Sequence, residues 1–267
     1  PAEQPSAPPA PDAPEQNLAA KTTSAGPQPP NQGSTLAKAN VKARALPSGF
    51  VAVPEAGVHS SGWPIEIICL KDKSHMMLAP AGEFEMGNSS GEPNTRPQHR
   101  VILKAFYIDK FEITLNQYKT FLDQRLTEKN PYRDLPPVAL AAATTDRHPV
   151  VGVAWRDANA FAEWSGKSLP TEAQWEKAAR GTDARRHPWG NESPQWDKPR
   201  EPTQLTRVGS FPWDVSIFGC YDMAGNAWEW CSDWYRADTY ARLALAGGVA
   251  RNPQGPDSPY DPAEPNQ

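Results

Sequence analysis

The sequence lacks the features that several large protein classes require. No stretch approaches the roughly 20 consecutive apolar residues of a membrane-spanning helix, so we expect no membrane span in these 267 residues. No run of lysine or arginine interrupts the mildly acidic balance, a net charge of −4, which argues against a surface that neutralises nucleic-acid phosphates. No repeat with a period of about 20 to 50 residues is visible, which excludes solenoid and propeller folds.

Several catalytic and metal-binding motifs are also missing. The five histidines do not occur at a ligand spacing such as H-x-x-x-H, so we expect no histidine-bound metal. There is no glycine-rich phosphate loop and no G-x-S-x-G elbow. The cysteines are Cys69, Cys220 and Cys231, without a C-x-x-C pair. At most one disulfide can form among them; we favour three buried free thiols, because an unpaired cysteine packs like a small hydrophobic residue.

Proline and tryptophan divide the chain into two regions. Residues 1–48 have no aromatic residue and few aliphatic ones, so they cannot bury enough apolar surface to offset their conformational entropy. We expect a disordered Pro/Ala-rich linker or stalk there, which favours an extracytoplasmic location in the periplasm, the envelope or the secreted fraction. Nine of the ten tryptophans lie between Trp155 and Trp234. We therefore predict one folded domain over residues 63–267, incomplete at its C-terminus, where the sequence turns polar and proline-rich.

Two segments predict strands. Residues 76–87 are typical of two short strands around a Pro-Ala-Gly turn, and residues 100–113 predict a strand that is broken once. Beyond Gly181 no helical periodicity is sustained. We expect a long, loop-rich stretch there that contains several groups of aromatic residues.

Three helices are predicted from their start and stop signals. Capping boxes of the form Thr-x-x-Gln begin at Thr114 and Thr171, and a third helix is expected over residues 156–165, ended by Gly166. We expect the helical carboxylates Glu163, Glu172 and Glu176 to be solvated. The arginines Arg180, Arg185 and Arg186 are expected to be solvated loop charges.

Five segments, in a fixed order, carry a resemblance to a known family. They are PAGEFxMG (80–87), FYIDKxEIT (106–114), HPVxGVxWxDA (148–158), LPTEAQWExAARG (169–181) and DMAGNAWEW (222–230). Together they resemble the formylglycine-generating enzyme, or sulfatase-modifying factor, family over residues 78–235. The resemblance implies a single, irregular α+β domain related to the C-type lectin fold, with little regular secondary structure.

The resemblance also implies a calcium site in the tract 222–229. Carried over residue by residue, it makes Asp222 and Glu229 side-chain ligands, and Gly225 and Ala227 backbone-carbonyl ligands. The chemistry agrees, because calcium takes six to eight oxygen ligands and a short glycine-containing loop with Asp and Glu supplies both kinds of oxygen. The alternative is that Asp222 and Asn226 form turn hydrogen bonds while the neighbouring tryptophans pack.

Catalytic members of the family oxidise a cysteine in a Cys-x-Pro-x-Arg segment of a sulfatase to formylglycine, using oxygen and a cysteine pair that binds copper. Thiolates suit Cu(I), since soft ligands select soft metals. None of the three cysteines here resembles that pair, so we assign no catalytic residue and expect no copper site of the family type. Whether the protein is an enzyme stays open: one hypothesis is a formylglycine-generating oxidase acting on a sulfatase-like polypeptide, and the other is a non-catalytic, lectin-like binding module.

Overall fold

The computed structural model describes residues 41–125, 145–193 and 204–261. The chain divides into two units, residues 1–31 and 32–267, and every described residue belongs to the second. None of the helices in these ranges has the length and apolar character needed to cross a bilayer. The predicted linker falls largely outside the described residues; its described part, residues 41–48, contains no helix or strand.

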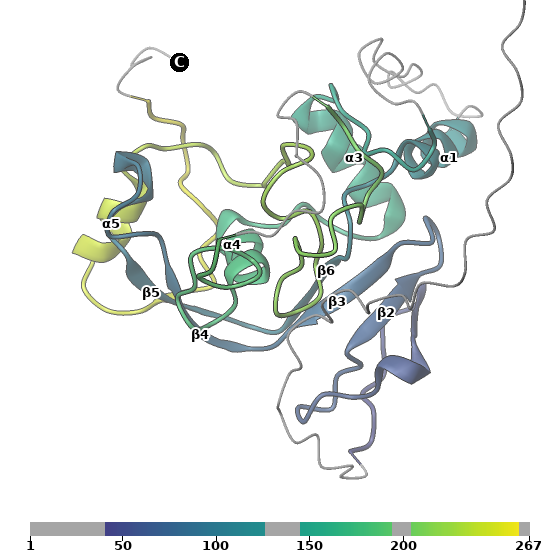
Figure 1. Ribbon diagram of the computed structural model, residues 1–267, viewed down its shortest axis with the longest axis horizontal. Coiled ribbons are helices and arrows are strands. Elements are labelled where there is room, and N and C mark those ends of the chain that lie inside the picture. The colour runs from purple at the N-terminus through teal and green to yellow at the C-terminus, as the bar shows by residue number, and fades with distance from the viewer. Residues whose placement is uncertain (1–40, 126–144, 194–203, 262–267) are drawn as a thin grey trace, which may run out of the picture. The chain divides into compact units, whose positions relative to one another are not determined.

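Two small sheets form the scaffold (Figure 1). The first is antiparallel and, in spatial order, consists of β1 (Phe50–Ala52), β2 (Glu66–Cys69), β3 (His75–Ala79) and β6 (Phe106–Asp109). The second consists of β4 (Gly82–Met86), β5 (His99–Leu103) and β7 (Ala250–Arg251), with β7 parallel to β5. Two short 3-10 helices, η1 (Pro54–Ala56) and η2 (Pro93–Thr95), lie in the connections. Together with the helices below, this confirms the α+β class.

The predicted turn at Pro80–Gly82 exists, but it joins strands of different sheets and does not close a hairpin. The ammonium group of Lys177 donates hydrogen bonds to the carbonyl oxygens of Pro80 (2.8 Å) and Gly82 (2.9 Å). Lys177 is 0% exposed, and burial lowers its pKa to about 8. A buried amine therefore fixes the crossing between the sheets, since each hydrogen bond made by a charged group is stronger than a neutral one.

The three predicted helices are present as α1 (Leu115–Arg125), α3 (Trp155–Ser165) and α4 (Glu172–Arg180). Both predicted capping boxes are confirmed: Gln117 Oε1 accepts the Thr114 backbone N–H at 2.9 Å, and Gln174 Oε1 accepts that of Thr171 at 2.8 Å. Gly166 ends α3 in the left-handed conformation, with φ at 78°.

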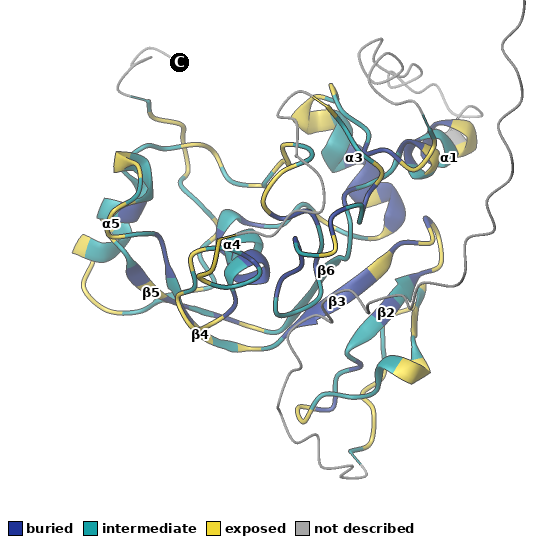
Figure 2. Cartoon of the chain, viewed as in Figure 1, coloured by how far each residue is buried: buried dark blue, intermediate teal, exposed yellow. Residues whose placement is uncertain are grey.

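Aromatic rings join α1 to α3. The stacked pair Tyr118 and Phe161 has ring centroids 5.9 Å apart, and Phe121 meets Trp164 edge-to-face at 5.4 Å. All four residues are buried, and both helices carry buried residues, coloured dark blue in Figure 2. Such offset and edge-to-face contacts stabilise a core beyond the area that they bury.

The C-terminal part of the domain contains more structure than the sequence predicts. A short helix, α5 (Thr239–Leu245), packs the buried ring of Tyr240 against the second sheet, and β7 follows it. The polar and proline-rich composition concealed both elements, because α5 is too short to show a helical period. At the other end, folded structure begins before the predicted start at residue 63, since β1 pairs with β2.

Two of the predicted solvated carboxylates are in fact packed. The Tyr240 hydroxyl lies 3.1 Å from Glu172 Oε1 and 2.9 Å from Glu176 Oε2. Burial raises the pKa of Glu172 to about 7. The prediction was wrong because α5, which covers this face of α4, was not foreseen. Glu163 is exposed, as predicted.

The arginine prediction was also wrong for two of the three side chains. Arg180 is ion-paired with Glu176, and its guanidinium donates to the carbonyl oxygens of Gly87 and Arg185 at 2.9 and 2.8 Å. Arg185 forms an ion pair with Asp183 at 2.7 Å. These arginines bind the loop after α4 to the end of β4.

All three cysteines are free thiols, as favoured. Cys69 and Cys220 are buried, while Cys231 is only half-buried. Burial raises the pKa of Cys220 and of Cys231 to about 12, so neither is a reactive thiolate at neutral pH.

A buried ion cluster joins three distant parts of the chain. Lys167 Nζ lies 2.6 Å from Asp72 Oδ2 and 2.8 Å from Asp109 Oδ2, with side-chain exposures of 6%, 0% and 22% respectively. Burial opposes the charged form of Asp72, but Lys167 outweighs it and lowers the Asp72 pKa. The cluster ties the turn between β2 and β3 to the end of β6 and to the segment after α3.

We expect Lys167→Met to lower the free energy of unfolding by roughly 3 to 5 kcal/mol, because it leaves the buried carboxylate of Asp72 and the half-buried carboxylate of Asp109 without their cation. Lys119→Met is the matched control: Lys119 pairs with Asp146 at 2.7 Å, but both side chains are exposed. That variant should change stability by less than about 1 kcal/mol. Urea denaturation of both variants measures the difference, and equal effects would contradict the assigned role of the cluster.

Candidate functional site

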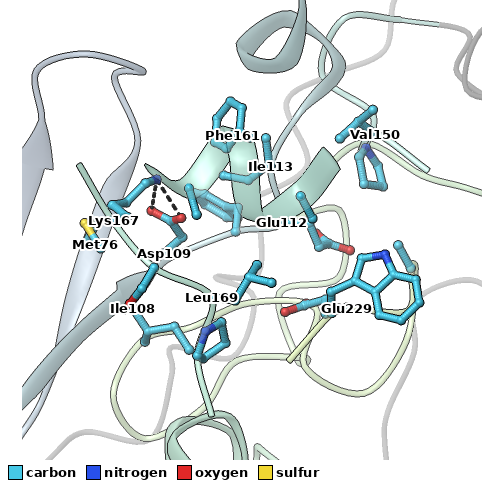
Figure 3. Close-up of a pocket in the computed structure, with 18 of the residues that line it drawn as sticks. Met76, Ile108, Asp109, Glu112, Ile113, Val150, Phe161, Lys167, Leu169 and Glu229 are labelled. Atoms are coloured by element: carbon cyan, nitrogen blue, oxygen red, sulfur yellow. Dashed lines mark hydrogen bonds and ion pairs between the residues drawn. The ribbon is translucent and has the colours of Figure 1, made fainter. Parts of the chain in front are cut away.

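A cavity of about 280 Å³ lies along β6 (Figure 3). One wall is β6 together with the following residues, Phe111 to Ile113. The opposite walls come from α3, from residues 167–170 and from residues 227–230. Most of the lining is aliphatic or aromatic, with the ion pair of Lys167 and Asp109 near one end and the carboxyl groups of Glu112 and Glu229 near the other.

The tract 222–229, predicted to bind calcium, folds as a tight loop beside this cavity. Asp222 is 1% exposed and has a left-handed backbone, with φ at 59°, which Asp tolerates better than most residues. Its Oδ2 accepts the backbone N–H of Gly209 at 2.5 Å. Gly225 is exposed, and its carbonyl accepts the Ala227 N–H at 3.0 Å. Ala227 and Glu229 line the cavity, whereas Asp222 and Gly225 do not.

Glu229 is an exposed residue, like its neighbours Trp228 and Trp230, but its carboxyl group points toward the cavity (Figure 3). Its Oε2 accepts the indole N–H of Trp175, on α4, at 2.9 Å. Burial of the carboxyl group raises its pKa to about 7, against the effect of the Trp175 hydrogen bond. The carboxylates of Asp109, Asp222 and Asp214 act in the same direction as burial.

Glu112 is the most unusual group in the cavity. It is 8% exposed, and within the described ranges neither of its buried carboxyl oxygens has a hydrogen-bond partner. Burial raises its pKa to about 9, and the negative charges of Asp222 and Glu229 add to the shift, while the side-chain amide of Asn226 opposes it. Buried polar groups are nearly always satisfied, so an unsatisfied carboxyl group in a cavity indicates a place for a ligand.

The oxygen donors beside the cavity are of the chemical type that a hard cation prefers. Three carboxyl groups, Glu112, Asp222 and Glu229, are close enough to raise the pKa of Glu112 by mutual repulsion. A divalent cation beside them would relieve that repulsion, and the loop carbonyls of Gly225 and Ala227 supply further oxygens. Among the described residues, no group of three or more His, Cys, Asp or Glu side chains is arranged to hold a metal ion by itself. The candidate site therefore depends on backbone carbonyls as much as on carboxylates.

Tryptophans border the mouth of the cavity. Trp228 is fully exposed and Trp230 is 49% exposed. The indole N–H of Trp230 donates to the carbonyl of Val153 at 2.9 Å, and that of Trp155 donates to the carbonyl of Cys231 at 2.8 Å. These two hydrogen bonds hold the segment 228–231 against the start of α3. The indole ring of Trp228 stays open to solvent.

No thiol lines the cavity in the part of the chain that the structure describes. Cys220 packs beneath it among Met77, Ala178 and Met223, and Cys231 contributes only its carbonyl, to Trp155. That none of the three cysteines is catalytic stays a prediction.

The family model for the sulfatase-modifying factor enzyme 1-like domain matches residues 68–258. The chain belongs to this family. Among the described elements, the match covers β3 to β7, the second half of β2 and the helices α1, α3, α4 and α5, together with every residue that lines the cavity.

Relatives of the chain include both enzymes of this family and larger proteins. A serine/threonine-protein kinase, pkn1, of Chlamydia pneumoniae is 37% identical over 205 residues, which is 72% of this chain and 31% of the kinase. The chain thus spans about a third of the length of that relative. The formylglycine-generating enzyme of Thermomonospora curvata is 31% identical over 239 residues, covering 68% of this chain and 78% of the enzyme.

One solved structure in the comparison is that of PvdO from Pseudomonas aeruginosa. It has 25% sequence identity and a TM-score of 0.49, and the alignment covers 69% of this chain and 79% of PvdO.

Sequence reasoning found the loop 222–229 but missed Glu112 as a site residue. Glu112 lies within one of the family-like segments, as a single carboxylate between apolar residues at the end of a predicted strand. That position is a signal, because alternation would place the side chain toward the interior. Its lack of a partner depends on the surrounding loops and has no counterpart in the local sequence.

Glu112→Gln should make stability less dependent on pH. The Glu112 carboxyl group has a folded-state pKa of about 9 against an ordinary 4.5. Its contribution to the stability of the wild type is therefore fully present below about pH 4.5 and is lost as the pH rises toward 9. The variant cannot ionise, so in a chelator-containing buffer it should exceed the wild type in unfolding free energy by more than about 1 kcal/mol at pH 8, and by much less at pH 5.

Urea denaturation at the two pH values measures this change. Glu163→Gln, on the exposed face of α3, is the matched control and should follow the wild type at both. A Glu112→Gln variant that is less stable than the wild type at pH 8 would show that the carboxyl group has a stabilising partner.

Proposed function

We propose that this chain is the substrate-facing scaffold of a formylglycine-generating protein. In the whole protein, a cysteine in a Cys-x-Pro-x-Arg segment of a sulfatase-like polypeptide would be oxidised to formylglycine at the cavity along β6, with dioxygen as the oxidant. The observation that carries the proposal is that the family-like tract ending in Trp228, Glu229 and Trp230 forms the wall of that cavity. Membership in the family, and relatives named as formylglycine-generating enzymes, support it.

The described residues can bind and orient a peptide but cannot bind copper through a thiolate pair. The walls of the cavity offer carboxylates, indoles and aliphatic side chains, whereas copper in its reduced state prefers soft sulfur ligands. No step is therefore assigned to copper in this chain. A cysteine pair would have to come from elsewhere in the whole protein. Without one, the domain is a binding module, and one relative is itself named an inactive formylglycine-generating enzyme.

The chain of 267 residues should form no aldehyde on a Cys-x-Pro-x-Arg peptide in the presence of copper and oxygen. An aldehyde-reactive probe read by mass spectrometry measures the product, with an established formylglycine-generating enzyme as the positive control. The same assay on the full-length protein tests the proposal, and absence of product there would leave the binding module as the function. Product from the chain alone would contradict the exclusion of its cysteines.

We propose that the loop beside the cavity binds calcium through the carboxylates of Asp222 and Glu229 and the carbonyls of Gly225 and Ala227. When bound, the ion would fix the loop and hold Glu229 ionised. The carboxylate crowding around Glu112 supports this, because a cation would lower the cost of keeping those groups charged.

Calcium at about 100 times its dissociation constant should stabilise the chain by about 2.7 kcal/mol, a rise in Tm of roughly 5 to 10 °C. The rise, measured by differential scanning fluorimetry in calcium against chelator, should vanish in the double variant Asp222→Ala, Glu229→Ala. It should persist in Glu163→Ala, where an exposed carboxylate on α3 is removed. If the double variant keeps the calcium-dependent rise, the ion is bound elsewhere.

A further inference from the structure

Strand β6 has the packing of an interior strand but the position of an edge strand. On one face, Phe106 and Ile108 pack with Met77 and with residues of α4. On the other face, Tyr107 packs with the core of β2 and β3, and its hydroxyl donates to the carbonyl of Pro64 at 2.6 Å. Yet β6 ends its sheet, and all four of its residues are half-buried.

The register shows which backbone groups of β6 remain open. His75 is opposite Lys110 and accepts its N–H at 2.8 Å, so hydrogen-bonded pairs alternate from there, and Ile108 and Phe106 bond to β3. The N–H and C=O groups of Tyr107 and Asp109 therefore point away from β3. Within the described residues, no backbone or side-chain hydrogen bond to these four groups is present.

The open edge borders the cavity described above. All four residues of β6 line it. Just beyond the end of β6, the Tyr221 N–H donates to the carbonyl of Lys110 at 2.9 Å. A paired strand lies about 4.8 Å from its neighbour and places alternate side chains on opposite faces. The cavity offers apolar walls for such side chains, including Phe161, Ile113 and Leu169 (Figure 3).

The charge of the cavity restricts what can occupy it. Glu112 and Glu229 both face the cavity, and no described residue forms a hydrogen bond with the buried carboxyl oxygens of Glu112. Lys167 is the only lysine among the described residues that line the cavity, and it is already ion-paired with Asp72 and Asp109. An acidic occupant would be repelled, whereas an arginine or lysine side chain would satisfy the free carboxyl oxygens.

We propose that an extended segment of a partner polypeptide adds to the free edge of β6 as a further strand, with apolar side chains in the cavity and one basic side chain against Glu112 and Glu229. Main-chain bonds to Tyr107 and Asp109 give affinity, and the alternate side chains give selectivity, as in other cases of strand addition. An exposed edge with aromatic residues is otherwise a liability that proteins cover. The inference concerns binding alone and holds whether or not formylglycine is made.

The test uses a fluorescein-labelled nine-residue peptide of alternating valine and threonine with a central arginine, titrated with the whole chain by fluorescence polarisation. Two further peptides carry N-methyl groups on one or the other set of alternate amides. Because a strand pairs through one edge only, one methylated peptide should bind at least ten-fold more weakly and the other within about three-fold of the parent. Equal binding of the two methylated peptides would overturn strand addition.

Charge recognition is tested in the same assay. Replacing the arginine by norleucine should weaken binding at least ten-fold for the wild type but leave the affinity for Glu112→Gln almost unchanged. Glu163→Gln should behave as the wild type. If Glu112→Gln binds the arginine peptide as tightly as the wild type, the basic side chain does not meet Glu112. If no peptide binds and the chain instead dimerises with rising concentration in light scattering, a second copy occupies the edge and the proposal is wrong.

Binding without aldehyde formation by the full-length protein would keep this inference and reject catalysis. If the full-length protein forms the aldehyde but the two N-methylated peptides bind equally well, catalysis is supported and strand addition is rejected.

Discussion

Lys167 holds the domain together at the place where the cavity begins. Its ammonium group bridges a carboxylate in the turn between β2 and β3 and a carboxylate at the end of β6. Because a buried ion pair is costly unless each charge is compensated, the three chain segments can pack only in the arrangement that brings these groups together. That arrangement sets the direction in which the chain leaves β6, and hence where Glu112 points.

The cavity contrasts with this satisfied cluster. At one end, two carboxylates share a cation, and at the other, Glu112 and Glu229 share none within the described residues. The structure retains carboxyl groups with raised pKa values beside the apolar part of the cavity and an unpaired strand edge. Groups of this kind mark binding sites, because the ligand supplies what the fold leaves unsatisfied. Calcium at the loop 222–229 and a basic side chain in the slot would relieve different parts of the same repulsion.

The sequence predicted correctly those features that depend on neighbouring residues, such as the ends of helices. The capping boxes at Thr114 and Thr171 and the terminating Gly166 predicted the helix ends, since each acts within one turn. Glu172 and Glu176 were predicted to be solvated because nothing in their own helix indicates that Tyr240, from a later segment, covers them. The same holds for Glu112, whose burial depends on loops more than 100 residues away in sequence. The loop 222–229 was recognised through its family-like motif, and its position beside the cavity required the fold.

The central claim is that β6 presents an open edge to the cavity. Amide hydrogen exchange of the chain alone, resolved by residue with nuclear magnetic resonance, tests it most directly. The account predicts slow exchange at Phe106 and Ile108, which bond to β3, and much faster exchange at Tyr107 and Asp109, which face the cavity. Equal protection of all four amides would show that another strand already covers this edge, and would contradict the account.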